Sequence, residues 1–225
     1  TVREQTAMAF PPLLALLAEV MELMRNGVDS LGPLPRLESH DKRTLQAALF
    51  NRSFRHLNSS INLALGGDYT GALTLVRTAY ENDYFLWEFD QRPESVDEFW
   101  EHKARPFGNI ADSIDKWLKD SGYEQDGVQR RHYKEVYGEQ LSTIAHPRIE
   151  AVLYEFDESF LHLMGGPQFL RDRALYTFES VLIAADLVLD RLGRFLEQRA
   201  DWCQTKDELH VRVEHWIHET HPEPT

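Results

Sequence analysis

The chain has 225 residues, 42% of them hydrophobic and 27% charged, a composition that excludes a disordered polymer and predicts a folded domain with a buried core. The formal net charge is −13 with neutral histidine, so the average electrostatic field repels phosphate backbones. The charge therefore argues against nucleic acid as a partner.

The longest apolar stretch, Phe10 to Val20, is too short for a membrane span, and no basic segment precedes it as in a signal peptide. The single cysteine, Cys203, cannot form an internal disulfide, which favours a reducing cytoplasm. We therefore expect a cytoplasmic protein with no membrane segment. The chain starts at Thr1 rather than methionine, which leaves open whether the natural N-terminus lies further upstream.

The first amphipathic helix is expected after Pro11-Pro12, because apolar side chains then recur at steps of three and four residues. The stretch "NGVDSLGPLPRLESHD" that follows is rich in glycine and proline and predicts a loop. The apolar positions of the helix are Leu13, Leu16, Leu17, Val20, Leu23 and Met24.

A second helix is expected from Asp41 to Leu65, where Gly66-Gly67 end it. Asp68 can then cap a third helix that runs to Phe89. Because the link is so short, the two helices are expected to be antiparallel neighbours.

Shorter elements follow Pro93, with "ESVDEFWEHKA" and "NIADSIDKWLKD" forming small helices on either side of Pro106. Another helix is expected from about 127 to 146, ended by Pro147. Polar and apolar residues then alternate, and the pattern predicts a β-hairpin near 151–164.

The longest helical pattern covers 169–198, and a capping box of Thr205 and Glu208 predicts a final helix over about 205–220. The fold class is therefore mainly α. We expect a single domain over 1–225, a bundle of about six to seven helices with one β-hairpin. Its core would span about 41–199, with the final helix as an accessory element.

Arg77 is the first candidate functional residue, because it lies among the apolar positions Leu73, Val76 and Tyr80 of the third helix. Glu81 follows four residues later on the same helix face. One interpretation is a structural ion pair at the edge of the core, where an unpaired guanidinium would be costly. The other is an anion clamp that lines a pocket and uses the planar donors of arginine.

Ser142 and His146 form the second candidate pair, since they lie four residues apart at the end of a predicted helix. The negative end of the helix dipole favours a protonated imidazole there. His146 could cap its own helix, share a polar pocket with Arg77, or act as the base for Ser142. No aspartate that would orient the histidine lies nearby, and the sequence has no Gly-x-Ser-x-Gly elbow.

The stretches "GGDYTGALTLVRTAYE" and "YGEQLSTIAHP", followed by the predicted hairpin and a long helix, resemble a bacterial group of all-helical proteins of unknown function. That group is distantly similar to HEPN-type helical bundles. The resemblance covers roughly 41–199 and implies that the helices of Arg77 and Glu81 and of Ser142 and His146 end beside each other. It implies no activity.

HEPN ribonucleases carry an arginine followed by a histidine after four to six residues, with a polar residue next to the arginine. The matching pair here is Arg212 and His218, but Val213 stands where the polar residue is expected. A metal-independent ribonuclease is therefore one alternative function.

His210, Glu214 and His218 recur at four-residue steps on the last predicted helix, and we call them the C-terminal histidine face. Histidine and glutamate at this spacing can chelate a divalent metal, whereas a solvated polar surface is the simpler interpretation. A metal-dependent hydrolase is thus a second alternative, although we expect no cofactor.

We expect a binding or regulatory module, as in a bacterial stress or defence system, with a polar pocket around Arg77 and His146. Its partner would be a small ligand or another protein. The aromatic residues, 11% of the chain, favour a homodimer that buries part of their surface.

Overall fold

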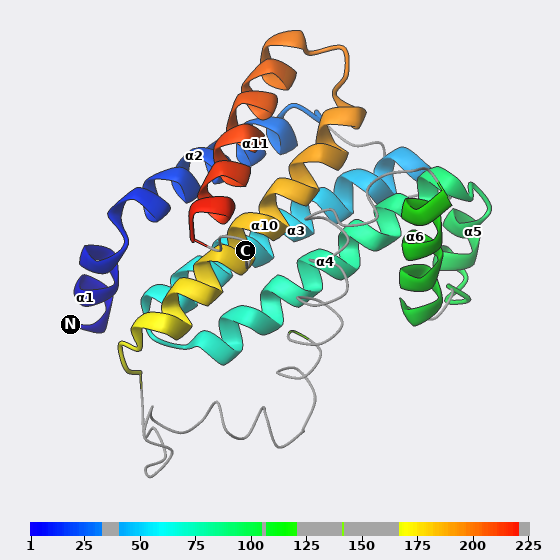
Figure 1. The fold of residues 1–225 in the computed structure, drawn as a ribbon. Coiled ribbons are helices and arrows are strands. Elements are labelled where there is room, and N and C mark those ends of the chain that lie inside the picture. Colours follow the sequence, from blue (N-terminus) through cyan, green and yellow to red (C-terminus); the bar gives the residue numbers. More distant parts are fainter. Residues whose placement is uncertain (33–40, 105–106, 121–140, 142–166, 221–225) are drawn as a thin grey trace.

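The computed structural model describes residues 1–32, 41–104, 107–120, 141 and 167–220. This part of the chain is mainly helical, which confirms the predicted fold class (Figure 1). The β-hairpin predicted near 151–164 is not borne out, because its residues lie outside the described ranges and the described ones form no strand. The helix expected over about 127–146 also lies outside them, apart from the buried Leu141.

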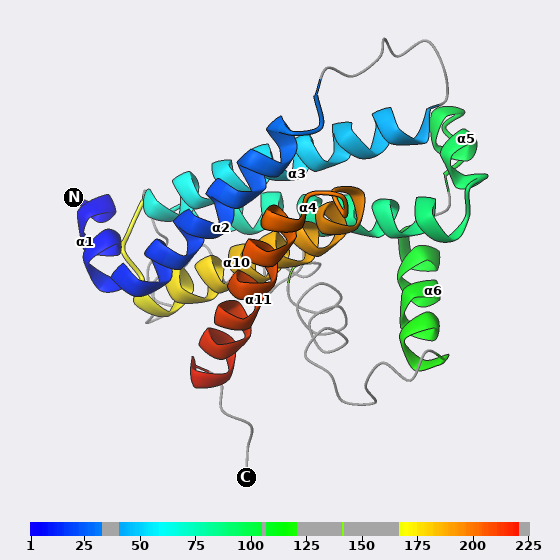
Figure 2. The same ribbon diagram turned by 90° about the horizontal axis from the view of Figure 1, so that it is seen from above.

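Three long helices form the centre of the molecule: α3 (Lys42–Leu65), α4 (Tyr69–Gln91) and α10 (Arg171–Phe195). The predicted cap of α4 is confirmed, since Asp68 accepts a hydrogen bond from the backbone N–H of Gly71. Asp41 caps α3 in the same way, by accepting one from the backbone N–H of Thr44. Helices α3 and α4 lie side by side and antiparallel, as the short link between them requires (Figures 1 and 2).

The turn between α3 and α4 also fixes the start of α10. Gly67 has a φ of +86°, and a Cβ there would lie 2.7 Å from the carbonyl oxygen of Gln168, so the position needs glycine. The hydroxyl of Tyr69 donates to the same carbonyl and accepts from the backbone N–H of Leu170, both at 3.1 Å. Helix α10 therefore begins beside the start of α4.

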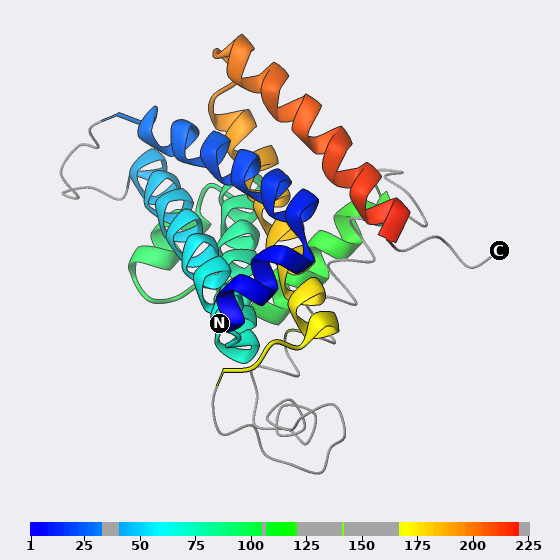
Figure 3. The same cartoon turned by 90° about the vertical axis from the view of Figure 1, so that its left-hand side faces the viewer.

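Helices α2 (Pro11–Asp29) and α11 (Ala200–Thr220) lie together on one side of the three central helices (Figure 3). Their junction with α10 is tight at Gly27, where a Cβ would lie 2.6 Å from Leu192 and 2.9 Å from Trp202. The indole N–H of Trp202 donates to the carbonyl of Leu23 at 3.1 Å. This bond fastens the start of α11 to α2.

The last helix begins earlier than its predicted capping box. Helix α11 starts at Ala200, and Thr205 lies inside it, donating its hydroxyl to the carbonyl of Asp201 at 3.0 Å. Helix α1 (Val2–Ala9), which no apolar periodicity announces, precedes the predicted helix after Pro11.

Two short helices, α5 (Ser95–Trp100) and α6 (Phe107–Asp120), follow the end of α4 on either side of Pro106, as expected (Figure 2). The rings of Trp87 and Trp117 meet edge to face at 6.1 Å and join α6 to α4.

In the described part of the chain, no single helix has the length and hydrophobicity needed to cross a membrane. Helices α1 and α2 meet that criterion only when taken together, and they are bent by 92°.

Candidate functional site

Arg77 and Glu81 form the ion pair that their spacing predicts. Arg77 Nε donates to Glu81 Oε1 at 3.1 Å, within α4. The two side chains are 18% and 33% exposed, so they lie at the edge of the core beside the buried Leu73 and Val76. Ser142 and His146 lie outside the described residues, so a pocket shared by Arg77 and His146 stays a prediction.

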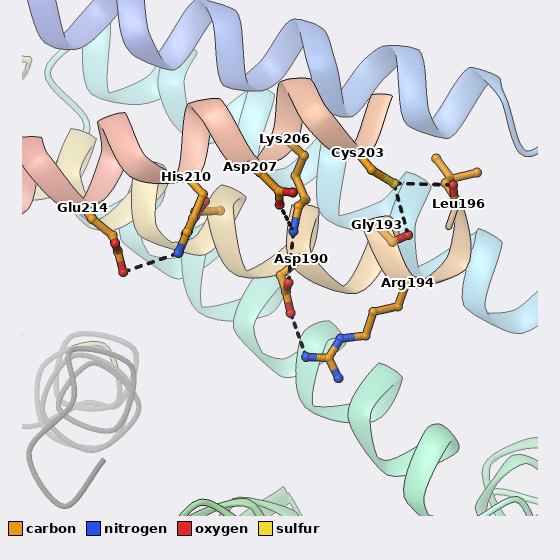
Figure 4. Close-up of polar contacts among 10 residues, drawn as sticks. Asp190, Gly193, Arg194, Leu196, Cys203, Lys206, Asp207, His210 and Glu214 are labelled. Carbon is orange, nitrogen blue, oxygen red and sulfur yellow. Dashed lines mark hydrogen bonds and ion pairs between the residues drawn. The ribbon is translucent and has the colours of Figure 1, made fainter. Parts of the chain in front are cut away.

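His210 of the C-terminal histidine face is held between two carboxylates. Its Nδ1 lies 2.8 Å from Asp186 Oδ2 on α10, and its Nε2 lies 3.3 Å from Glu214 Oε1 on α11. The hydrogen bond with Asp186 raises the pKa of His210 to about 8, against the opposing effect of burial. At neutral pH the ring is therefore mostly protonated, and both of its nitrogens face carboxylates. Figure 4 shows the contact with Glu214.

A protonated imidazole has no lone pair for a metal ion, so a metal must displace the proton of His210 first. His218 is exposed on the same helix. Within the described residues, no group of three histidine, cysteine, aspartate or glutamate side chains is arranged to hold a metal ion. The geometry of the described part thus offers no support to the metal-dependent hydrolase.

A second polar network joins α10 to α11 around Asp190 (Figure 4). Arg194 donates to Asp190 Oδ2 at 2.9 Å, and Lys206 Nζ lies 3.3 Å from the other carboxylate oxygen and 3.0 Å from Asp207. Burial raises the pKa of Asp190, but the charges of Arg194, Lys206 and Arg191 outweigh burial and lower it. Asp190 is therefore ionised at neutral pH.

Cys203 lies at the C-terminal end of α10, next to this network. Its Sγ lies 3.6 Å from the carbonyl oxygen of Leu196 and 3.9 Å from that of Gly193, two carbonyls at the end of the helix (Figure 4). The thiol thus contacts a helix terminus, where backbone acceptors need donors.

A buried ion pair connects α4 to α10. Arg191 Nε donates to Asp83 Oδ1 at 3.2 Å, and the two side chains are only 11% and 1% exposed. The hydroxyl of Tyr80 is buried nearby. Its pKa is raised well above the usual range, first by burial and then by Tyr176, Asp83 and Asp186. The pair and Tyr80 place strongly polar groups inside the bundle.

A cavity of about 110 Å³ lies between α3, α4 and α10, beside that pair. We call it the arginine cavity; its lining residues are Gln46, Phe50, Leu86, Asp90, Arg191, Arg194 and Phe195. Its apolar side is well packed, since Phe50 and Leu86 are each 1% exposed and the rings of Phe50 and Phe195 meet edge to face at 5.8 Å.

Among the described residues that line the arginine cavity, Asp90 supplies a carboxylate. Asp90 accepts from Gln46 Nε2 at 3.0 Å and lies 2.8 Å from Lys42 Nζ. The guanidinium of Arg43 lies over the ring of Phe195, 5.3 Å from its centroid. The cavity thus combines an apolar side with several polar groups, as small-molecule sites do.

Arg212, the arginine of the Arg212–His218 spacing that resembles HEPN ribonucleases, forms an ion pair with Glu19 on α2. Its guanidinium makes two hydrogen bonds to the carboxylate of Glu19 on α2, the longer at 2.9 Å. It lies in an open groove of about 330 Å³ between α2 and α11 that also contains Glu22 and Glu208. A ribonuclease would need a basic groove, and this groove is acidic.

The arginines of the cavity were missed by the sequence analysis, although a signal for one of them exists. Arg191 falls on the apolar face of α10, three residues after Val188 and four after Leu187, much as Arg77 does on α4. Arg194 is exposed at the end of its helix and offers no such signal.

Comparisons with family models, with curated proteins and with solved structures find no match to this chain.

Proposed function

We propose that this protein is a binding module and that its ligand site is the arginine cavity. The observation that carries the proposal is the arrangement of Arg191 and Arg194 beside the packed apolar side of one cavity. The cavity opens to solvent at Asp90 and Arg194, which are 37% and 56% exposed, so a ligand can reach it. A cavity that gathers two guanidiniums, a carboxylate and an amide is better explained as a site.

The size of the arginine cavity limits the ligand. At about 110 Å³ the cavity is well below the roughly 300–1,000 Å³ of pockets that take drug-sized ligands. The module is therefore proposed to take a small polar molecule.

The wider setting of the proposal rests on the resemblance to all-helical bacterial proteins. We still predict a role in a stress or defence system, a homodimer and a cytoplasmic location. A second polar pocket formed by Arg77 with His146 also stays a prediction.

A screen of small charged and neutral molecules by ligand-observed NMR tests the proposal. We expect members of the screen to bind the wild-type protein and to lose binding in Arg194→Ala, an exposed position where truncation spares the core. Arg52→Ala, which removes an exposed arginine from α3 outside the cavity, should bind as wild type does. Absence of any bound molecule, or equal binding by all three proteins, would contradict the proposal.

A further inference from the structure

We infer that the ligand of the arginine cavity is a short-chain carboxylate, and that Asp190 competes with it for the guanidinium of Arg194. This inference rests on the proposed function, and it names the chemistry of the ligand and the group that regulates its binding.

The charged groups around the cavity decide how an anion can enter it. Among the described residues, four positive side chains lie in or at the cavity, and Asp41, Asp83, Asp90 and Asp190 are carboxylates that interact with them. An anion must therefore take over a positive side chain from one of these carboxylates, in a chain whose formal net charge is −13. The four positive side chains are Lys42, Arg43, Arg191 and Arg194.

The form of the donors points to a planar oxyanion. Arg191 and Arg194 lie three residues apart on α10, so they occupy the same helix face. A guanidinium presents donors in a planar fork that matches the two oxygens of a carboxylate.

The apolar side distinguishes a carboxylate from inorganic phosphate. Phe50, Leu86 and Phe195 offer no donor to a second set of oxygens, so phosphate would bury part of its charge against them. A short alkyl chain gains from the same surface, at about 0.8 kcal/mol for each buried methylene. A carboxylate of three or four carbons satisfies both sides of the cavity.

Asp190 occupies the position of a competitor. Its Oδ2 accepts from Arg194 at 2.9 Å, and its other oxygen faces Lys206 on α11 (Figure 4). A bound carboxylate would draw Arg194 away, and Asp190 would keep Lys206 as its partner. Ligand binding therefore exchanges one ion pair for another, at the contact between α10 and α11.

Isothermal titration of the full chain tests this with butyrate, inorganic phosphate, butanol and butylammonium as probes. We expect butyrate to bind most tightly, with butanol and phosphate at least tenfold weaker and butylammonium not bound. Asp190→Asn should tighten butyrate binding about three- to tenfold, because the uncharged amide oxygen of asparagine is a weaker acceptor for Arg194 than the carboxylate. Asp172→Asn removes the same charge at the opposite end of α10 and should leave the affinity unchanged.

The outcomes separate the ligand class from the proposed function. Binding of butanol or butylammonium as tight as that of butyrate, or tighter binding of phosphate, overturns the carboxylate and leaves the module a binder. Equal affinities in Asp190→Asn and Asp172→Asn overturn the competition. If no probe binds while the NMR screen yields other molecules that need Arg194, only this inference fails. If the screen is also empty, the proposed function fails with it.

Discussion

His210 on α11 lies 2.8 Å from Asp186 on α10, with Glu214 on the other side of its ring. The contact is an electrostatic link between these helices, and Lys206 with Asp190 is another. Of the two, only the link through His210 changes its charge near neutral pH.

The stability of the protein should therefore fall between neutral and mildly alkaline pH. Folding raises the pKa of His210 to about 8 from an ordinary value near 6.5, so the folded state binds the proton more tightly. The stabilisation is complete below pH 6.5 and is lost as the pH rises through about 8. Urea unfolding at a series of pH values checks this.

His210→Gln is the reference variant for that measurement. The difference in unfolding free energy between wild type and His210→Gln should be larger at pH 6 than at pH 9. A difference that does not vary with pH would show that His210 is not charged by its contact with Asp186.

Removing the charge of Asp83 should destabilise the fold by about 3 kcal/mol, because the largely buried Arg191 would lose the carboxylate that its Nε contacts. Chemical denaturation of Asp83→Asn measures the loss. Asp29→Asn, at the exposed end of α2, changes the same kind of side chain and should stay within about 0.5 kcal/mol of wild type. Similar stabilities of the two variants would mean that the Asp83–Arg191 pair is dispensable.

Zinc should bind the C-terminal histidine face only weakly at neutral pH. The outer residues His210 and His218 are about two helical turns apart, roughly 12 Å along the axis, so adjacent pairs alone can share an ion. The proton on His210 also competes with the metal. Titration calorimetry with zinc checks this, and sub-micromolar affinity that disappears in His218→Ala would establish a metal site instead.

The purified protein should not cleave RNA at physiological salt. Arg212 is engaged by Glu19, and the groove around it is lined by further glutamates. A gel assay with a structured RNA measures cleavage. Activity that vanishes in either Arg212→Ala or His218→Ala would reverse the order of the hypotheses in favour of the ribonuclease.

The sequence predicted helix boundaries well where the residue that ends or caps a helix lies next to that helix in the chain. Asp68 caps the helix that it precedes, as the sequence predicts. The capping box at Thr205 misled because a threonine inside a helix can also bond to the preceding turn, as Thr205 does to Asp201. The two cases look alike in the sequence.

The candidate site was less predictable, because its contacts join distant residues. The pair of Arg77 and Glu81 follows from a spacing of four. Asp83 and Arg191 are 108 residues apart, and no spacing rule links them. The arginine cavity exists only because α10 packs between α3 and α4, so tertiary packing had to be known first.

A crystal structure of the full chain grown with butyrate tests the central claim most directly. The account predicts density for the carboxylate at Arg191 and Arg194, with the alkyl chain against Phe50 and Phe195, and a longer distance between Arg194 and Asp190 than the present 2.9 Å. A cavity that holds only water at saturating butyrate, with Arg194 still bound to Asp190, would contradict it.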